Sequence, residues 1–190
     1  MTKHNHEPNQ ECSVCNSKGS AADKKREIMS TLSQHIAKTG MAIIGIIGTR
    51  AYTVGRAASG KPELYMSAPM TGVAQRIFND IDLSGVELFN GVCVPAGTIE
   101  GLGYDLHVFD VTVHMKTEEV HFALMPDFNQ GKPVAFFQVI FADANNKMPW
   151  APDYDKAFDQ EPILSVDTMK TLADKARIET ERRNAVKGSH

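Results

Sequence analysis

Apolar side chains recur every four residues near the start of the chain, at Ile28, Leu32 and Ile36. This spacing places them on one face of a helix, as in a surface helix that packs on a core. Ser20, followed three residues later by Asp23, forms an S-x-x-D signal for a helix start. The pattern predicts an N-terminal helix that begins just after Ser20.

Two further segments have helical periodicity. Residues 73–83 place Val73, Ile77 and Ile81 on one face and predict a short helix. Residues 166–186 predict a C-terminal helix, whose last turns, RIETERR, are almost wholly charged. Its narrow apolar stripe consists of Val166, Met169, Ala173 and Ala176. Such a charged helix end is either solvated or a surface that binds a partner.

Strands are predicted where β-branched and aromatic residues cluster, at 41–47, 51–56 and 63–67. The segment 133–143 is nearly continuously apolar, which is typical of a central strand. The stretch 104–115, YDLHVFDVTVHM, is the longest predicted strand, but its apolar residues change face half-way along. Either a β-bulge or burial on both faces would produce this change.

Together these elements predict an α+β fold. We expect a single domain with a mostly antiparallel sheet, an N-terminal helix, a short middle helix and a C-terminal helix. The globular domain is placed at 23–165, after a mobile polar tail at 1–22, and 166–187 form a C-terminal helical extension. Residues 188–190, Gly-Ser-His, resemble a tag scar.

Composition and charge exclude several classes of partner. The chain has 190 residues, enough for one domain with its own core. A formal net charge of −3 gives no overall attraction to nucleic acid or to an acidic membrane, so neither is expected as a partner. No apolar run approaches the roughly 20 residues of a membrane span. Three cysteines, an odd number, do not form a disulfide framework, so we predict a cytoplasmic protein.

Three motifs occur in a distinctive order: AYTVG at 51–55, GKPEL at 60–64 and QVIFADANNKMPW at 138–150. They resemble the bacterial and phage family called domain of unknown function 4262, and the similarity covers roughly residues 24 to 165. Some members also carry a Cys-x-x-Cys before the first helix, which CSVC would match. The resemblance implies a fold rather than an activity, and Arg56 departs from it because the family usually has leucine there.

A candidate anion site follows from the strand that contains Tyr52. Arg50, Tyr52 and Arg56 alternate along the chain, so on one continuous strand their side chains would share a face. A guanidinium offers a planar fork of donors to phosphate or carboxylate. With Lys61 in the next turn, these residues predict a site for a small anion. The alternative is a solvent-facing strand whose arginine stems cover apolar surface.

Glu63 and Trp150 complete the predicted ligand-binding set. Glu63 lies at a strand entrance, where a carboxylate either accepts hydrogen bonds from the N–H groups of a turn or contacts a ligand. Trp150 follows Pro149 in a stiff, turn-rich segment. It would form either the wall of a small-molecule pocket or a lid on the core, with Asp143 capping the preceding turn.

Candidate metal ligands cluster in the N-terminal tail. His4, His6, Cys12 and Cys15 supply four soft or borderline ligands, enough for tetrahedral zinc. The alternatives are a redox pair of cysteines or a disordered tail. Elsewhere, Cys93 between two valines reads as a buried small hydrophobe.

Three histidines outside the tail are further candidate metal ligands. His107 and His114 would converge if a bulge lay between them, and His121 would join them across a hairpin. That arrangement would hold a metal or an acid/base pair, whereas a single strand histidine is more often just half-buried.

From these residues we expect a small-molecule binding or sensing module for an anionic ligand. One alternative is a small hydrolase or transferase with a metal ion, although the chain has no HExxH motif or nucleophile elbow. Another alternative is a homo-oligomeric interaction protein that assembles through the helix at 166–186.

Overall fold

The structure is a computed structural model that describes residues 20–46, 49–67, 71–99, 102–158 and 160–187. Within this part of the chain, a sheet of six strands is combined with four α-helices and four short 3-10 helices. The predicted α+β class is confirmed, as are the N-terminal, middle and C-terminal helices. Residues 1–19, on which the prediction of a polar tail mostly depends, lie outside the described residues.

The sheet has the strand order β1-β2-β3-β6-β5-β4. Its strands are β1 (Ala42–Ile46), β2 (Arg50–Val54), β3 (Glu63–Met66), β4 (Cys93–Val94), β5 (Leu106–Asp110) and β6 (Phe136–Phe141). Only β3 and β6 pair in parallel, and the other pairings of the described strands are antiparallel. β6 lies between β3 and β5, as its continuous apolar sequence predicts for a central strand.

β5 is shorter than the predicted strand at 104–115. It ends at Asp110, whose Oδ1 accepts hydrogen bonds from the backbone N–H of Thr112 at 3.0 Å and from its hydroxyl at 2.6 Å. This local bond starts a 3-10 turn and leaves Val113 89% exposed. The bulge explanation is wrong, because the β5–β6 pairing is continuous from Leu106 to Asp110. The explanation by burial on both faces is confirmed, since Val108 and Phe109 are both 0% exposed and belong to core clusters on opposite faces of the sheet.

Helix α1 (Ala21–Thr39) begins as the sequence predicts. The Ser20 side chain accepts from the Asp23 backbone N–H, and the Asp23 carboxylate accepts from the Ser20 backbone N–H, which completes a capping box. Gly40 ends the helix in the left-handed conformation, at φ 83°. Leu32, on the side of α1 that faces the sheet, is buried in a cluster with Ala42 and Tyr52.

The remaining helices cover different parts of the sheet. They are α2 (Thr71–Ser84), α3 (Pro126–Asn129), α4 (Val166–Lys187) and the 3-10 helices η1 (Arg56–Ser59), η2 (Thr112–His114), η3 (Thr117–Glu119) and η4 (Lys156–Phe158). One face of the sheet packs on α2, where Ile77 and Phe78 meet Leu64 and Val139. The other face carries two clusters, one with α1 and α3 and the other with α4.

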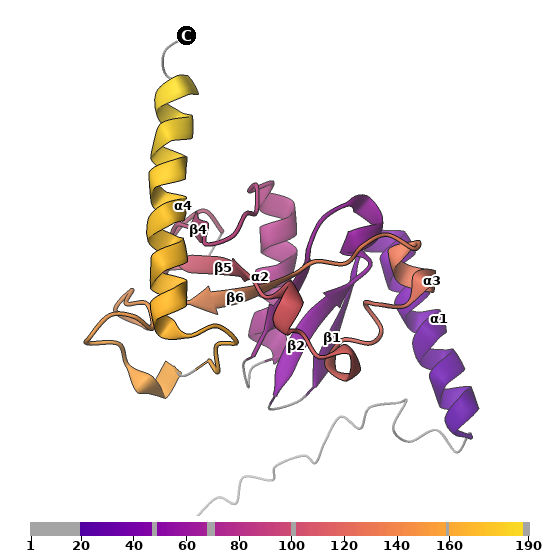
Figure 1. Cartoon of the computed structure of the whole chain (residues 1–190). Helices are drawn as coiled ribbons and strands as arrows, with labels where there is room; N and C mark the ends of the chain where they lie inside the picture. The colour runs from indigo at the N-terminus through magenta and orange to yellow at the C-terminus, as the bar shows by residue number, and fades with distance from the viewer. Residues whose placement is uncertain (1–19, 47–48, 68–70, 100–101, 159, 188–190) are drawn as a thin grey trace, which may run out of the picture.

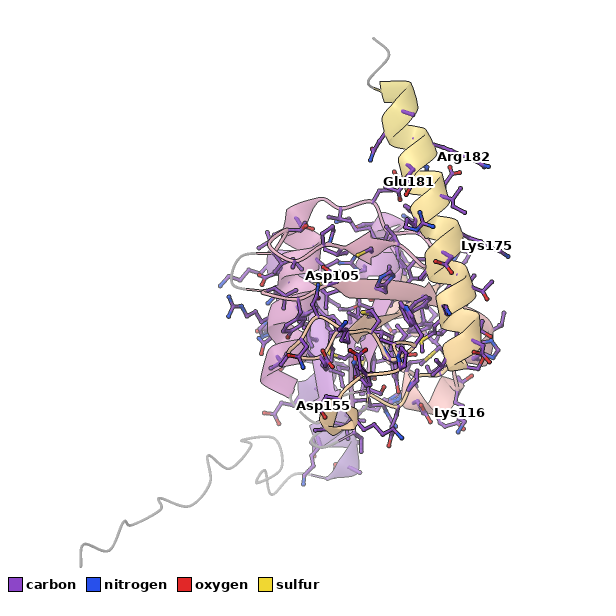
Figure 2. All side chains as sticks on the ribbon, turned by 90° about the vertical axis from the view of Figure 1, so that its left-hand side faces the viewer. Asp105, Lys116, Asp155, Lys175, Glu181 and Arg182 are labelled. Atoms are coloured by element: carbon purple, nitrogen blue, oxygen red, sulfur yellow. The ribbon has the colours of Figure 1, made fainter. Side chains whose placement is uncertain are left out.

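Helix α4 stands at the end of the sheet formed by β4, β5 and β6, opposite α1 (Figure 1). Met169, Ala173 and Ala176 form its buried stripe, as predicted, whereas Val166 is 40% exposed. Figure 2 shows Lys175 and Arg182 pointing outward from α4. None of the described helices combines the length and apolar character that a membrane-spanning segment needs.

Gly91, just before β4, lets α4 approach the sheet closely. Its φ of 84° is a conformation that other residues rarely adopt, and a Cβ added there would lie 2.4 Å from the carbonyl oxygen of Leu172. The backbone of α4 therefore lies directly against this glycine.

Candidate functional site

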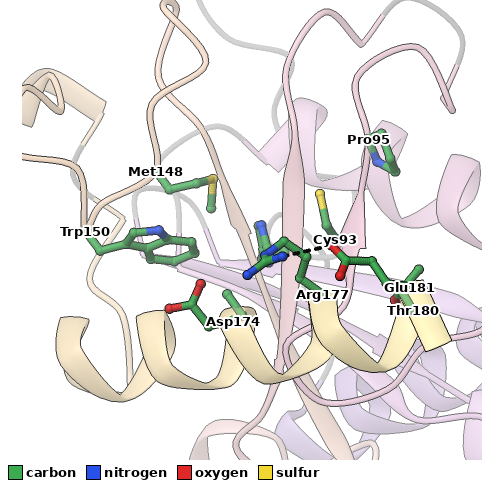
Figure 3. A pocket seen from close by; sticks show the side chains of 10 residues that line it. Cys93, Pro95, Met148, Trp150, Asp174, Arg177, Thr180 and Glu181 are labelled. Atoms are coloured by element: carbon green, nitrogen blue, oxygen red, sulfur yellow. Dashed lines mark hydrogen bonds and ion pairs between the residues drawn. The ribbon is translucent and has the colours of Figure 1, made fainter.

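A pocket of about 420 Å³ lies between α4, the β4–β5 edge of the sheet and the loop that follows β6 (Figure 3). This volume is within the range of about 300–1,000 Å³ that small-molecule sites have. Its lining residues are Cys93, Pro95, His107, Met148, Trp150, Ala173, Asp174, Arg177, Thr180 and Glu181. The floor is formed by sulfur-containing and aromatic side chains, and the wall from α4 is charged.

Strand register brings Cys93 and His107 together. The two residues are directly opposite each other in the antiparallel β4–β5 pair, so their side chains are on the same face of the sheet. Both are half-buried and both line the pocket.

The His107 ring is fixed by one hydrogen bond. Its Nδ1 lies 3.0 Å from the carbonyl oxygen of Gly91, and since a carbonyl only accepts, Nδ1 carries the proton. Burial lowers the pKa of His107, which outweighs the opposing effects of the Gly91 carbonyl and the Asp105 carboxylate. At neutral pH the ring is therefore uncharged, and Nε2 has a free lone pair.

The Cys93 thiol is protonated at neutral pH. Burial raises its pKa to about 11, and the nearby carboxylate of Asp105 adds to the effect. A thiol in this state is a poor nucleophile, because the thiolate is the reactive form. The cysteine–histidine pair is therefore not arranged like an activated catalytic dyad.

Trp150 forms the aromatic part of the floor. Its ring lies edge-to-face with His107, at 5.2 Å between centroids, and with Phe109, at 6.1 Å. Trp150 belongs to the cluster that includes Met148 and Met169. It therefore both covers part of the core and lines the pocket, so the two predicted roles of Trp150 coexist.

Asp143 holds the loop that carries Trp150. Its buried carboxylate accepts hydrogen bonds from the backbone N–H groups of Asn145, Lys147 and Asp155, at 2.8, 2.9 and 2.8 Å. Burial acts to raise the pKa of Asp143, but these three donors outweigh it and hold the pKa below its ordinary value. The predicted capping of the turn by Asp143 is confirmed.

The α4 wall carries two carboxylates and one guanidinium. Arg177 donates to Glu181 at 2.8 Å, one helical turn away. Within the described part of the chain, the carboxylate of Asp174 forms no hydrogen bond or ion pair. Figure 3 shows Asp174 on the side of the pocket nearest Trp150, with Glu181 towards Pro95.

Residues 35–155, more than half of the chain, match the family described as Domain of unknown function (DUF4262). The chain belongs to this family. No curated protein and no solved structure matches it. The membership inferred from the sequence motifs is confirmed. Since the DUF4262 match ends at residue 155, it contains the pocket floor, while the α4 wall lies beyond it.

The predicted pair of arginines is not brought together in this DUF4262 protein. β2 ends at Val54, and Gly55, at φ 104°, turns the chain into η1. Arg56 therefore does not continue the alternation of the strand, and the expectation that it shares a face with Arg50 is wrong. Arg50 lies 3.9 Å from Glu119 of η3, whereas Arg56 binds Asp82 of α2.

Arg56 and Lys61 hold η1 against α2. Arg56 is 4% exposed and donates to Asp82 Oδ1 at 2.6 Å and to the Pro62 carbonyl at 2.8 Å. Lys61 donates to the same Asp82 oxygen at 2.8 Å. Burial acts to raise the pKa of Asp82, but the Lys61 hydrogen bond and the Arg56 charge outweigh it and hold this pKa below its ordinary value. Both cations already have a carboxylate partner within the described residues.

Glu63 is buried and binds the turn that precedes it. One carboxylate oxygen accepts from the N–H groups of Gly55 and Ala57, each at 2.9 Å, and the other accepts from the Thr53 hydroxyl at 2.6 Å. Burial raises the pKa of Glu63, against these hydrogen bonds and the Arg56 charge. The structural interpretation of Glu63, as a binder of turn N–H groups, is confirmed.

Tyr52 is a core residue that lies opposite Tyr65 in the β2–β3 pair. Burial raises the pKa of Tyr52 to about 12, although Arg50 and a hydrogen bond with the Phe122 backbone act in the opposite direction. The Nε atom of Arg50 is buried without a hydrogen-bond partner in the described part of the molecule.

The three histidines that were considered as one site have different surroundings. His107 lines the pocket, while His121 contacts the ring of Phe122 at 4.0 Å between centroids and His114 is exposed. The described residues contain no group of three or more His, Cys, Asp or Glu side chains able to hold a metal. The predicted zinc ligands His4, His6, Cys12 and Cys15 lie outside the described residues.

Sequence reasoning missed Cys93 and His107 as a pair. β4 has two residues and lies in a stretch rich in glycine, and its alignment with β5 is a long-range property. The one local sign of a strand was the run of three apolar residues from Val92 to Val94, whose side chains would point to alternate faces of a sheet.

Proposed function

We propose that this DUF4262 protein is a small-molecule binding module whose ligand occupies the pocket beside Trp150. The observation that carries the proposal is the composition of this pocket: a floor of Met148, Trp150 and His107 faces a charged wall from α4. Ligand sites usually combine such an apolar floor with a few polar groups that fix orientation. The proposed role is the binding or sensing role expected from the sequence. The proposed site, however, is the pocket beside Trp150 and not the surroundings of Arg50 and Arg56.

The polar groups of the pocket favour a ligand with hydrogen-bond donors. The Nε2 atom of His107 is an acceptor, and the carboxylate of Asp174 is an acceptor without a partner among the described residues. Arg177, the one guanidinium of the lining, is already bound to Glu181. We therefore propose a compact, largely apolar ligand that carries an amine or hydroxyl group, and not the anion expected at first.

Three aromatic probes of similar size test this preference: benzylamine, benzyl alcohol and benzoate. The chain has one tryptophan, so excitation of Trp150 reports directly on the pocket. Benzylamine and benzyl alcohol are expected to change its emission saturably at millimolar concentration, which suits fragment-sized ligands. Benzoate is expected to bind about tenfold more weakly, since it offers negative charge to Asp174.

Variants separate pocket binding from a general effect on the protein. Asp174→Asn is expected to weaken benzylamine several-fold and to leave benzyl alcohol unchanged. His107→Phe keeps a ring beside Trp150 but removes Nε2, so both probes are expected to weaken. His121→Phe, the same substitution outside the pocket, serves as the control. Unsaturable responses, or equal responses of wild type and the two pocket variants, would refute the proposal.

The metal-dependent enzyme and the homo-oligomer remain predictions. Against the first, the carboxylate of Glu63 already accepts hydrogen bonds from the Thr53 hydroxyl and from the N–H groups of Gly55 and Ala57. For the second, α4 displays a charged outer surface that includes Lys175 and Arg182. We give preference to the binding module because the pocket supports it directly.

A further inference from the structure

Three side chains with soft or borderline donor atoms line the floor of the pocket: Cys93, His107 and Met148. Directly opposite residues of an antiparallel pair have Cβ atoms about 4.5–5.5 Å apart. The register of β4 and β5 therefore places the Cys93 thiol and the His107 imidazole within reach of one ion. Met148, 8% exposed, enters the same space from the loop after β6.

His107 has the environment typical of a metal-binding histidine. Such histidines donate their second ring N–H to a carbonyl or carboxylate, which fixes the tautomer and the ring orientation. Here Nδ1 donates to the Gly91 carbonyl at 3.0 Å, and Nε2 keeps its lone pair. The Trp150 ring packs edge-to-face against His107, with 5.2 Å between the ring centroids.

The donor atoms select the kind of ion. Thiolate and thioether sulfur prefer Cu(I) and related soft cations, whereas Mg²⁺, Ca²⁺ and Mn²⁺ prefer oxygen ligands. A structural zinc ion would need four nitrogen, sulfur or oxygen ligands of the usual types. Among the described residues no group of even three His, Cys, Asp or Glu side chains meets at one point. The methionine sulfur completes a set of three that suits a monovalent soft ion.

We propose that Cys93, His107 and Met148 bind Cu(I) through Sγ, Nε2 and Sδ in a three-coordinate site. As the ion binds, the Cys93 S–H bond breaks, its proton goes to solvent, and a sulfur–copper bond forms. Copper stays in the +1 state, so no electron is transferred. This site goes beyond the organic ligand proposed above and does not depend on it.

The test uses the full chain with Cys12→Ser and Cys15→Ser, so that Cys93 is the remaining thiol. Ag(I), a redox-stable probe, is titrated while Trp150 emission is followed. Cu(I) affinity is then measured without oxygen, by competition with bicinchoninate. One equivalent of either ion is expected to quench the emission. We expect Cys93→Ser to lose at least a hundredfold in affinity, and His107→Phe and Met148→Leu about tenfold each.

Met66→Leu is the matched control, because Met66 is buried on the opposite face of the sheet with α2. It is expected to bind both ions as the starting protein does, and thermal unfolding checks that every variant is folded. Binding that survives in Cys93→Ser overturns the proposal. So does binding that His107→Phe and Met148→Leu leave unchanged, since the thiol alone would then hold the ion. Benzylamine is titrated separately, so failure of the metal site is distinguishable from failure of the organic-ligand site.

Discussion

Gly91→Ala tests whether α4 and the pocket depend on one close backbone contact. Two costs are expected. The first is the left-handed backbone at φ 84°, which costs a residue with a Cβ about 1–2 kcal/mol. The second is steric, because the new Cβ would lie 2.4 Å from the Leu172 carbonyl oxygen, and overpacking of this kind costs about 1–3 kcal/mol. The free energy of unfolding should fall by about 2–5 kcal/mol.

Gly97→Ala separates the two costs. Gly97 has nearly the same φ, 81°, but an added Cβ would meet no atom within 4 Å. It should therefore lose about 1–2 kcal/mol, from the backbone term alone. The difference between the two variants measures the contact with α4.

Urea unfolding followed by Trp150 emission provides the measurement, because Trp150 packs in the same cluster as Met169 of α4. Hydrogen exchange adds a local readout. In Gly91→Ala the amides of α4 should lose protection before those of β6, whereas Gly97→Ala should leave this order unchanged. Equal losses of stability in the two variants, with α4 protected equally in both, would refute the reasoning.

Two further predictions concern the contacts of Asp82. Arg56→Ala removes a buried cation with two hydrogen bonds and should lower the free energy of unfolding, measured in denaturant, by about 3 kcal/mol. Lys61→Ala changes a side chain that is 51% exposed and should lower it by less than about 1 kcal/mol. Similar losses in the two variants would contradict the inference that burial makes the Arg56 contact the stronger one. Because the Asp82 pKa is lowered in the folded state, its contribution is present above the ordinary carboxyl pKa and is lost as pH falls through the lowered value. The stability gap between wild type and Asp82→Asn should therefore narrow as pH falls from 6 to 2, and a gap that is constant or widens in acid would contradict this sign.

The elements that sequence predicts well here are those set by neighbouring residues. Ser20 and Asp23 form their capping box within one turn of helix, and the apolar composition of β6 is enough to make it central. The end of β5 was missed because the Asp110–Thr112 bond competes with the strand, and hydrophobic pattern does not register such a bond.

The candidate site was harder to predict because it depends on contacts between distant segments. Cys93 meets His107 only through strand register, and the α4 wall reaches them only because Gly91 has no side chain. Trp150 was predicted as a pocket wall from its own segment. Arg50 and Arg56 were expected together because the left-handed turn at Gly55 was read as a continuing strand.

The parallel pairing of β3 with β6 has a consequence for the order of folding. β1, β2 and β3 form one antiparallel unit of nearby residues, and β4, β5 and β6 form another. The β3–β6 pairing joins these two units, although its partners are about 70 residues apart in the sequence. Bringing such distant segments together has an entropic cost that short hairpins avoid. We therefore expect the β3–β6 pairing to form later than the antiparallel pairings within each half.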